Sequence, residues 1–546
     1  MLDWKKLINK ERLKKSKLKD DRNEFESDYG RIIYSPALRR MHDKTQVFPL
    51  TTDDNIHSRL THSNEVMSLG YTFGLKLSKS ELIQKKTGLQ EVELLRILPV
   101  LLQNICLIHD IGNAPFGHFG ETIVSDYFKN LKGKKNKSFL KLSEHQQRDF
   151  LYYDGNAQGL RVITKLQYLD NPFGLNLTLG TLASYLKYPN YENINKVKEE
   201  KLKKIGRLLK QKEIECSKHG VFYSEIKYFE KIVDECGLKV KDKIVRHPLC
   251  YLMEAADSIA YLCMDMEDGF NKNIYGIKDI EDEFSRSKGE IAEEIISICR
   301  NSYYDDNTKI VNIRIKLIGH LVQLAFTNFE KNLKKIEIGT YNQELIKDDP
   351  NKIYKALESF SSKIFKSREI NYLESTGHSV FTGLLDFYIE FLFHDNEKYV
   401  KRAKHLISRS IIECAIEENL LTIGDVKFEK MLKSLRKDVS TFKKKGPEKA
   451  RDLEKEAEKI KQHKAKFGEL KTSYEVLFEN QQMRPLTVLE ESELKRLRFE
   501  IRGIINPDFD DLNEYYKFRV ILDFISGMTD QFAVAHYQKI SGQKIN

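Results

Sequence analysis

The sequence predicts a mainly α-helical fold, and three observations support this class. Apolar residues recur at helical spacing through long stretches, and proline is scarce, with 11 residues in 546. Hydrophobic residues make up 40% of the chain and charged residues 32%, which is typical of a soluble protein with a highly charged surface. A chain of this length and composition can bury a large core, which argues against a disordered protein.

The first element that bears on function is a buried helix predicted over Glu91–Asp110. Its apolar side chains recur at helical spacing at Leu94, Leu95, Leu98, Leu101, Leu102 and Ile105. We expect Pro99 to kink this helix. An adjacent His109–Asp110 pair ends it, and the Gly and Pro residues of IGNAPFG then turn the chain. His118 and Glu121 are therefore predicted to lie on a new segment that folds back over the pair.

A second buried helix is predicted over YLMEAADSIAYLCMDMEDG, residues 251–269. Asp257, Tyr261 and Asp265 recur every four residues, so they share one face of this helix. Buried carboxylates need partners or a metal ion, because an unpaired buried charge is costly. The alternative is a solvent-facing stripe, which the surrounding apolar residues disfavour.

Three charge-rich stretches interrupt the apolar pattern: Lys129–Lys137, Asn193–Glu215 and Lys433–Lys471. We expect them to form solvated helices and loops, because mixed-sign charge runs usually serve solubility. The last stretch mixes both signs at helical spacing and predicts an extended surface helix. An oligomer contact or a nucleic-acid contact is the alternative for it.

The composition also restricts the setting of the protein. The N-terminal residues lack the apolar core of a signal peptide, and no stretch approaches the roughly 18 uncharged apolar residues of a membrane span, so we expect a cytoplasmic location without membrane contact. The seven cysteines form no CxxC and are odd in number, which indicates reduced thiols. A formal charge of +10 permits a polyanionic partner such as nucleotide phosphate or nucleic acid.

His109 and Asp110 are also the most informative candidates for a metal site. A neutral imidazole nitrogen and a carboxylate oxygen suit one divalent cation. One pair cannot close a site, but His62 in SRLTHSNEV and Asp257 in the second helix can complete a set of two histidines and two aspartates. A lone histidine is more often a hydrogen-bonded core residue, so the conjunction carries this prediction.

The spacing H-x(46)-HD-x(146)-D, set in RLTHS, HDIGNAPFGHFGE and EAADSIAYLCMDMEDG, resembles the HD-domain phosphohydrolases. More narrowly, the chain resembles the bacterial deoxyguanosine triphosphate triphosphohydrolases. The 13-residue string HDIGNAPFGHFGE is the most specific part of the likeness. Further segments follow in the order of that family: ALRRMHDKTQVFPL, NAQGLRVI, TLASYLKYPN, VFYSEIKYF and DFISGMTDQFAVAHY.

The resemblance implies one divalent metal ion per subunit, held by His62, His109, Asp110 and Asp257. Two neutral imidazoles and two carboxylates would balance the charge of the ion and leave positions open for water and a phosphate oxygen. Mixed nitrogen and oxygen ligands suit Mn, Fe, Co, Ni or Zn, whereas Mg prefers oxygen ligands more strongly. The ligand types therefore leave the identity of the metal open.

Further roles are implied for residues near these ligands. His118 matches the position that the family uses near the α-phosphate, and Glu121 would orient its ring or stabilise its charge as it protonates the departing 5′-oxygen. The alternative for His118 is a loop histidine that caps a turn. Arg59 resembles the arginine of the family that binds the α-phosphate, and Lys187 and Tyr188 match positions that bind the phosphate tail.

Gln46, Tyr261 and Asp265 resemble the group that reads the deoxyribose in this family. An aromatic ring under the sugar would exclude a 2′-hydroxyl, and the amide and the carboxylate would bond the 3′-hydroxyl. Ordinary packing is the alternative for Gln46 and Tyr261. Glu374 in YLESTGH matches more loosely and is expected to line the same pocket.

The likeness implies an N-terminal arm over residues 1–30, an HD-domain helical core over 31–290 and a C-terminal helical region over 291–546 packed on the core, with a charged insert near 433–471. It implies hydrolysis of dGTP, with other dNTPs left open, to a deoxynucleoside and inorganic triphosphate. It also implies a homo-oligomer, often a hexamer, with single-stranded DNA or a nucleotide as effector. The alternatives are an HD-domain nucleotidase or phosphodiesterase of other specificity, and a nucleotide-sensing protein that binds single-stranded nucleic acid.

Overall fold

The computed structural model describes residues 1–16, 20–48, 50, 57–167, 172–191, 217–241, 243–443 and 446–543. Within these residues the chain is mainly α-helical, so the predicted fold class is confirmed. Extended pairing in the described part is confined to isolated bridges and one antiparallel hairpin, in which β1 (Lys239–Val240) pairs with β2 (Lys243–Ile244).

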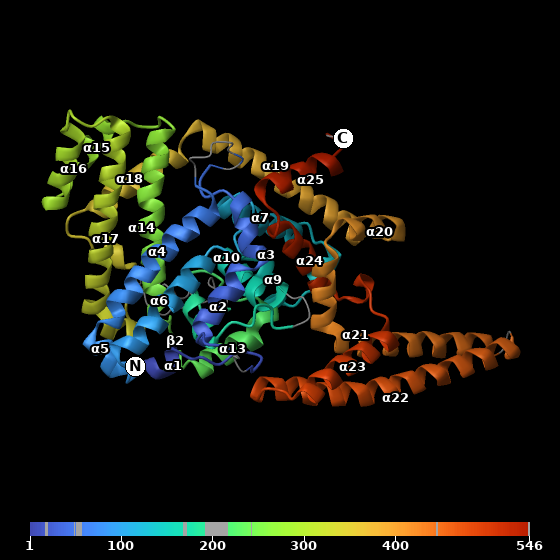
Figure 1. Ribbon diagram of the computed structural model, residues 1–546. Helices are drawn as coiled ribbons and strands as arrows, with labels where there is room; N and C mark the ends of the chain where they lie inside the picture. The colour runs from blue at the N-terminus through green and yellow to red at the C-terminus, as the bar shows by residue number, and fades with distance from the viewer. Residues whose placement is uncertain are drawn as a thin grey trace, which may run out of the picture.

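The first part of the chain folds into helices around a central pair, α4 and α6 (Figure 1). The described helices are α1 (Trp4–Leu7), α2 (Glu24–Ile33), α3 (Pro36–Arg40), α4 (Arg59–Ser78), α5 (Glu81–Thr87), α6 (Glu91–Ile108), α7 (Gly117–Gly133), α8 (Lys137–Leu140), α9 (Glu144–Leu151), α10 (Gly155–Arg161) and α11 (Leu179–Tyr185). A 3-10 turn at Met41–Asp43 follows α3, and a π-helical turn at Val162–Leu166 continues α10.

The rest of the chain supplies longer helices. Those of the middle part are α13 (Ile226–Glu235), α14 (Pro248–Asn271), α15 (Ile277–Phe284), α16 (Glu290–Arg300), α17 (Asp306–Glu337) and α18 (Ile353–Phe365). Those of the C-terminal part are α19 (Arg368–Leu392), α20 (Glu397–Leu406), α21 (Arg409–Phe442), α22 (Pro447–Met483), α23 (Val488–Ile505), α24 (Glu514–Ser526) and α25 (Asp530–Ile540). Short 3-10 turns lie at Tyr223–Glu225, Leu345–Lys347 and Phe509–Asp511.

Glycines allow α4 and α6 to pack closely. A Cβ atom at Gly74 would lie 2.3 Å from Cα of Pro99, and one at Gly70 would lie 2.4 Å from Sγ of Cys106. Only a residue without a side chain fits such an approach. The predicted helix over Glu91–Asp110 is thus observed as α6, with Pro99 inside it and His109 at its C-terminal cap. The close packing brings the first turn of α4 to the end of α6.

The second predicted helix is α14, which packs along α4 and α17. Asp265 is buried on it, and Asp257 and Tyr261 are half-buried, so the expected polar stripe does not face bulk solvent. Of the described helices, α17 is long and apolar enough to cross a membrane by length and composition. It carries Arg314 and Lys316 within its apolar run and packs on α14, so we interpret it as a core helix.

Two apolar clusters form the core of the described residues. The first lies under α4, α6, α14 and α17. The second joins residues 114–222, which follow the His109–Asp110 pair, to apolar side chains of the C-terminal helices between Val380 and Ala533. The C-terminal region therefore shares a core with the segment that follows the His109–Asp110 pair. The boundaries at residues 30 and 290 stay predictions.

The charged insert forms part of a two-helix hairpin, α21 and α22, which projects from the body at the right of Figure 1. The ring of Phe467 lies against Gly424, where a Cβ atom would be 2.4 Å from its Cζ. The described residues of the stretch Lys433–Lys471 are thus mainly helical and largely exposed, as predicted, but they form the end of one helix and the start of another. Lys129–Lys137 is also mostly exposed, whereas Asn193–Glu215 lies outside the described residues.

Buried ion pairs connect the N-terminal helices to the C-terminal region. Arg161 of α10 pairs with Glu225 at 2.9 Å, with Glu418 of α21 at 3.0 Å and with Asp523 of α24 at 2.8 Å. Breaking such a set leaves an uncompensated buried charge, which is strongly destabilising. These contacts therefore hold α21 and α24 in one position against α10, close to the loop that follows the His109–Asp110 pair.

Candidate metal centre and its surroundings

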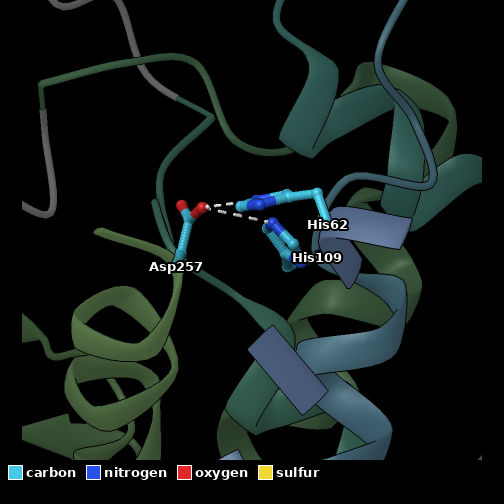
Figure 2. Close-up of side chains that lie close together, drawn as sticks. All are labelled: His62, His109 and Asp257. Atoms are coloured by element: carbon cyan, nitrogen blue, oxygen red, sulfur yellow. Dashed lines mark hydrogen bonds and ion pairs between the residues drawn. The ribbon is translucent and has the colours of Figure 1, made fainter. Parts of the chain in front are cut away.

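Three side chains from distant parts of the chain converge between α4, α6 and α14 (Figure 2). His62 comes from the first turn of α4, His109 caps α6, and Asp257 comes from α14. Oδ1 of Asp257 lies 3.1 Å from Nε2 of His62 and 3.4 Å from Nε2 of His109. The candidate ligand atoms all lie within 4.8 Å of one another, so a single cation can reach all three.

The hydrogen bonds of His109 explain why this cluster fits a cation. Its Nδ1 lies 2.6 Å from the carbonyl oxygen of Cys106 and donates to it, so Nε2 presents a lone pair. This buried Nε2 has no hydrogen-bond partner among the described residues and faces the carboxylates of Asp110 and Asp257. Lone pairs that face one another in a buried site need a cation between them, and a divalent metal ion with nitrogen and oxygen ligands meets that need.

The same carboxylates change the affinity of His109 for a proton. Burial alone would lower the pKa of His109, but Asp110 and Asp257 outweigh it and raise the pKa to about 9. Without a metal ion, a proton therefore takes the position between these groups. Metal binding must displace this proton, so we expect the affinity for metal to fall as the pH falls.

Asp110, the fourth predicted ligand, lies beside the cluster and is shared with Arg59. Its Oδ1 is 3.7 Å from Nε2 of His109 and accepts a hydrogen bond from Nδ2 of Asn113 at 2.7 Å. Its Oδ2 forms an ion pair with the Arg59 guanidinium. Burial favours the neutral acid, but His109 and Arg59 keep the pKa of Asp110 below its ordinary value. The predicted phosphate arginine is thus held at the edge of the cluster by a predicted metal ligand.

The predicted phosphate lysine lies next to the same cluster. Nζ of Lys187 is 3.5 Å from Oε1 of Glu254 and 3.9 Å from Oδ2 of Asp257. Burial alone would lower the pKa of Lys187, but Tyr188 and Glu254 raise it well above its ordinary value. The ammonium is therefore charged beside Asp257, where an anion bound at the cluster would meet it.

Lys218 is a second cation in this area, and sequence analysis missed it. Its Nζ lies 3.0 Å from Oδ2 of Asp154 and 5.8 Å from the centre of the Tyr188 ring, which Lys187 approaches to 6.0 Å. The ring of the predicted tail residue Tyr188 is therefore approached by two ammonium groups. No motif marks Lys218, because its place near the site depends on how the chain returns after the charged stretch Asn193–Glu215.

His118 and Glu121 form the expected pair at the start of α7. Nδ1 of His118 lies 3.1 Å from Oε2 of Glu121, and the His118 side chain is 75% exposed whereas that of Glu121 is 8% exposed. Oε1 of Glu121 accepts a hydrogen bond from the amide of Gly155 at 3.1 Å, which fixes the carboxylate. This carboxylate raises the pKa of His118 above its ordinary value. The imidazole thus keeps its proton to higher pH, as a general acid requires.

The residues predicted to read a sugar come from α14 and from the segment before α4. The side-chain oxygen of Gln46 is buried without a described hydrogen-bond partner, so it remains available to a donor from a ligand. Tyr261 and Asp265 lie on the same face of α14 as Asp257, and burial together with Asp268 raises the pKa of Asp265 above its ordinary value. A neutral Asp265 would donate a hydrogen bond as well as accept one.

His57 holds the segment that carries Gln46, and sequence analysis did not single it out. Its carbonyl accepts the Gln46 amide at 3.4 Å, and its ring nitrogens lie 3.0 Å from Asp268 and 3.0 Å from Glu65. Burial alone would lower the pKa of His57, but the two carboxylates raise it to about 10. The charged ring therefore ties Gln46 to α4 and α14.

Glu374 is half-buried on α19, one turn before Gly377, where the helix packs on the ring of Phe116. Within the described part of the chain, Glu374 forms no hydrogen bond or ion pair with the three metal-binding candidates. Its expected place in the substrate pocket stays a prediction.

Comparisons with known proteins show which chains this one is similar to. It is 33% identical over 447 residues to a deoxyguanosinetriphosphate triphosphohydrolase-like protein of Listeria monocytogenes, which covers 76% of this chain and 90% of the relative. It is 34% identical over 353 residues to a protein of the same name from Synechocystis, covering 63% of this chain and 76% of the relative. A deoxyguanosinetriphosphate triphosphohydrolase of Yersinia pestis is 31% identical over 406 residues, covering 67% of this chain and 76% of the relative.

A family model for the phosphohydrolase-associated domain matches residues 470–539. The match begins within α22 and ends within α25, so it includes α23 and α24. These C-terminal helices share the second apolar cluster with the residues that follow the metal motif.

Removing the Asp257 carboxylate is expected to weaken metal binding strongly. Asp257→Ala deletes the oxygen nearest to both histidines, so we expect the metal affinity to fall by about 100-fold or more. Isothermal titration with Mn²⁺ and elemental analysis after dialysis measure the effect. Ser258→Ala, on the same helix, serves as the control because Ser258 instead bonds Glu344. Equal metal content in the Asp257→Ala and Ser258→Ala proteins would contradict the site.

Proposed function

Because the chain belongs to the deoxyguanosinetriphosphate triphosphohydrolase-like family, we propose that it hydrolyses deoxynucleoside triphosphates, with dGTP favoured, to a deoxynucleoside and inorganic triphosphate. Phosphohydrolase activity follows from the family, whereas the substrate and the products are the proposal. The observation that carries it is the convergence of His62, His109 and Asp257 beside two cationic side chains, Arg59 and Lys187.

His62, His109, Asp110 and Asp257 would hold one divalent cation, of Mn, Mg or another transition metal such as Fe, Co, Ni or Zn. When bound, such an ion supplies Lewis acidity to a phosphoryl group. Asp110 is kept ionised by Arg59 and His109, so it needs no deprotonation before it binds a cation. The carbonyl of Cys106 fixes the tautomer of His109 that has its lone pair at Nε2.

The surrounding cations are proposed to bind the triphosphate. Arg59 at the edge of the cluster would offset charge that develops on the α-phosphoryl oxygens. Lys187 beside Asp257 would hold the phosphate tail, and Lys218, which also approaches the Tyr188 ring, adds a second positive charge for it. Water attack at the α-phosphorus breaks the bond to the 5′-oxygen, and His118 would give that oxygen its proton.

The sugar-reading residues are proposed to select deoxyribose. The ring of Tyr261 would lie under the sugar and exclude a 2′-hydroxyl, and Gln46 and Asp265 would bond the 3′-hydroxyl. The buried side-chain oxygen of Gln46, which has no hydrogen-bond donor among the described residues, supports this role, because a buried acceptor without a donor is costly until a ligand supplies one. We also propose a cytoplasmic homo-oligomer, with a hexamer as the expected assembly and a nucleotide as effector.

The products identify the bond that is broken. The purified protein, incubated with each dNTP and with several divalent ions, is expected to release a deoxynucleoside and inorganic triphosphate, with dGTP turned over fastest. Chromatography of the products, with ribonucleotides in parallel, makes the measurement. Pyrophosphate with a nucleoside monophosphate would contradict the proposal and favour an HD-domain enzyme of other specificity.

The His118–Glu121 pair predicts the pH dependence of turnover. Glu121 raises the pKa of His118, so the acid form persists at higher pH and kcat falls only as the pH passes that raised value. Glu121→Gln keeps the acceptor for the Gly155 amide but removes the negative charge. The fall of kcat on the alkaline side of its pH profile is therefore expected to move to lower pH. His118→Ala is expected to lower kcat about 100-fold or more. His463→Ala, exposed on α22, is the control.

An alkaline limb that does not move in the Glu121→Gln protein would contradict the role of this pair. Full turnover in the His118→Ala protein would remove His118 from proton transfer.

A second candidate function, binding of single-stranded nucleic acid, is favoured by one groove. It measures about 780 Å³ between α19, α20 and α25. Its charged lining is entirely basic or histidine, and the rings of Phe387 and Phe391 form part of its apolar surface. The basic residues are Lys398, Lys401, Arg402, His405 and Lys539, with His536 beside them. A basic groove with aromatic rings fits the phosphates and stacked bases of a single strand.

Charge reversal in this groove tests the second function. Among the described residues neither Lys401 nor Arg402 forms an ion pair, and Arg402 lies 6.0 Å from the centre of the Tyr399 ring, so both charges can reach phosphates. The double variant Lys401→Glu with Arg402→Glu is expected to lower the affinity for a single-stranded oligonucleotide by about 10-fold or more. The slope of the logarithm of the binding constant against the logarithm of the salt concentration is expected to become shallower by about 1.4. Gel shifts at several salt concentrations measure both. Lys433→Glu with Lys437→Glu on the α21 surface is the matched control.

Equal loss in the two double variants would show a nonspecific charge effect. Loss in the α21 variant alone would place the contact on the hairpin and overturn the groove.

A further inference from the structure

Asp530, the first residue of α25, accepts hydrogen bonds from two distant segments of the site. Its Oδ1 accepts the amide of Phe116 at 3.0 Å, and its Oδ2 accepts the amide of Thr45 at 2.9 Å and also the Thr45 hydroxyl. The side chain is 1% exposed, so these bonds are made without competition from water. Thr45 precedes Gln46, and Phe116 lies two residues before His118.

Lys44 ties the same three segments together a second time. Its buried Nζ donates to the carbonyl of Asn113 at 2.6 Å and to the carbonyl of Ser526 at 2.9 Å. Its own carbonyl accepts the amide of Arg59 at 2.8 Å. The segment with Gln46, the loop after the metal motif and the junction of α24 with α25 are therefore bonded to one another at several points.

The loop that Asp530 contacts has a conformation that needs support. Phe116 has φ +60°, and Gly117 after it also has φ +60°. A left-handed conformation is unfavourable for a residue with a side chain, so the surroundings must offset its cost. Gly117 has a further constraint, because a Cβ atom there would lie 2.7 Å from Nη2 of Arg59. These two residues turn the chain into α7, where His118 is the second residue.

We propose that Asp530 is a positioning residue that sets the placement of His118 and Gln46 together. The inference rests on the proposed function, since it gives these two residues their roles. One carboxylate oxygen stabilises the left-handed turn before His118, and the other holds the residue next to Gln46. A general acid and a sugar contact that are far apart in sequence thus depend on one side chain from the C-terminal region.

A second contact joins the C-terminal region to α7, but it lies away from the turn before His118. Asp386 of α19 accepts the hydroxyl of Tyr127 at 2.7 Å, so it also joins the C-terminal region to α7. Tyr127 lies nine residues after His118 and is half-buried against the second apolar cluster. Asp386 therefore provides a matched control for a tie that supports α7 without touching the turn.

The test is Asp530→Asn, which has the same shape but cannot accept from both segments. We expect kcat for the favoured dNTP to fall about 10-fold or more, because small displacements of reacting groups are costly. We also expect the ratio of kcat/KM for a deoxynucleotide to that for the matching ribonucleotide to fall about 10-fold or more. Metal content should equal that of the native protein. Asp386→Asn is expected to leave both quantities unchanged.

The ratio separates positioning from general stability. A variant that only unfolds more readily has fewer active molecules, so kcat falls while the deoxy-to-ribo ratio stays the same. An unchanged ratio in Asp530→Asn would therefore overturn the inference. If that protein does not fold, Thr45→Val carries the test, because it removes the hydroxyl bond to Asp530 and should lower the ratio with kcat within about 3-fold. An unchanged ratio there would be equally decisive.

Hydrogen exchange distinguishes failure of this inference from failure of the proposed function. In Asp530→Asn the amides of Thr45 and Phe116 should exchange faster, while those at Tyr127 keep their native rates. This readout needs no substrate. Native exchange rates at both amides would contradict the positioning role whether or not the protein hydrolyses nucleotides, and a native protein that hydrolyses no dNTP would contradict only the proposed function.

Discussion

The groups that converge between α4, α6 and α14 need a positive charge among them, and this is the constraint on which the rest of the structure depends. His62, His109 and Asp257 place lone pairs toward one point, and the bond from Nδ1 of His109 to the Cys106 carbonyl keeps its Nε2 directed there, so a proton or a metal ion must occupy that point. Such an arrangement is unfavourable unless a cation joins it. Close packing of α4 on α6, which Gly70 and Gly74 permit, is what brings the two histidines together.

The positive side chains around this centre are each paired with a carboxylate. Asp110 is shared between the centre and Arg59, and Lys187 lies beside both Asp257 and Glu254. Each positive group is therefore held by a carboxylate near the place where a phosphate would bind. In the proposed function, a phosphate would meet cations whose positions are already fixed, so its binding would need little reorganisation. This preorganisation is a property of the described side chains and does not depend on the base of the nucleotide.

The sequence predicted the elements better than the contacts between them. Helical spacing marks α6 and α14 because their apolar residues repeat once per turn, and the motif residues lie within or directly beside these helices. The pairing of Asp110 with Arg59 was not predicted, although both residues were singled out, because pairing depends on how α4 docks on the loop after α6. Lys218 was missed because no periodicity or motif marks a residue that reaches the site only through the tertiary fold.

The C-terminal region shows the same limit in a more instructive form. Its sequence predicted helices packed on a core, and the segment DFISGMTDQFAVAHY contributed to the family resemblance, but nothing in its spacing indicated that Asp530 reaches the turn before His118. A left-handed residue such as Phe116 persists only when its surroundings determine it, and the determinant here lies more than 400 residues away in the chain. A phosphohydrolase-associated segment that supplies such a contact cannot be exchanged independently of the helices that carry the site residues. The conformation of the turn before His118 and the docking of α25 depend on each other.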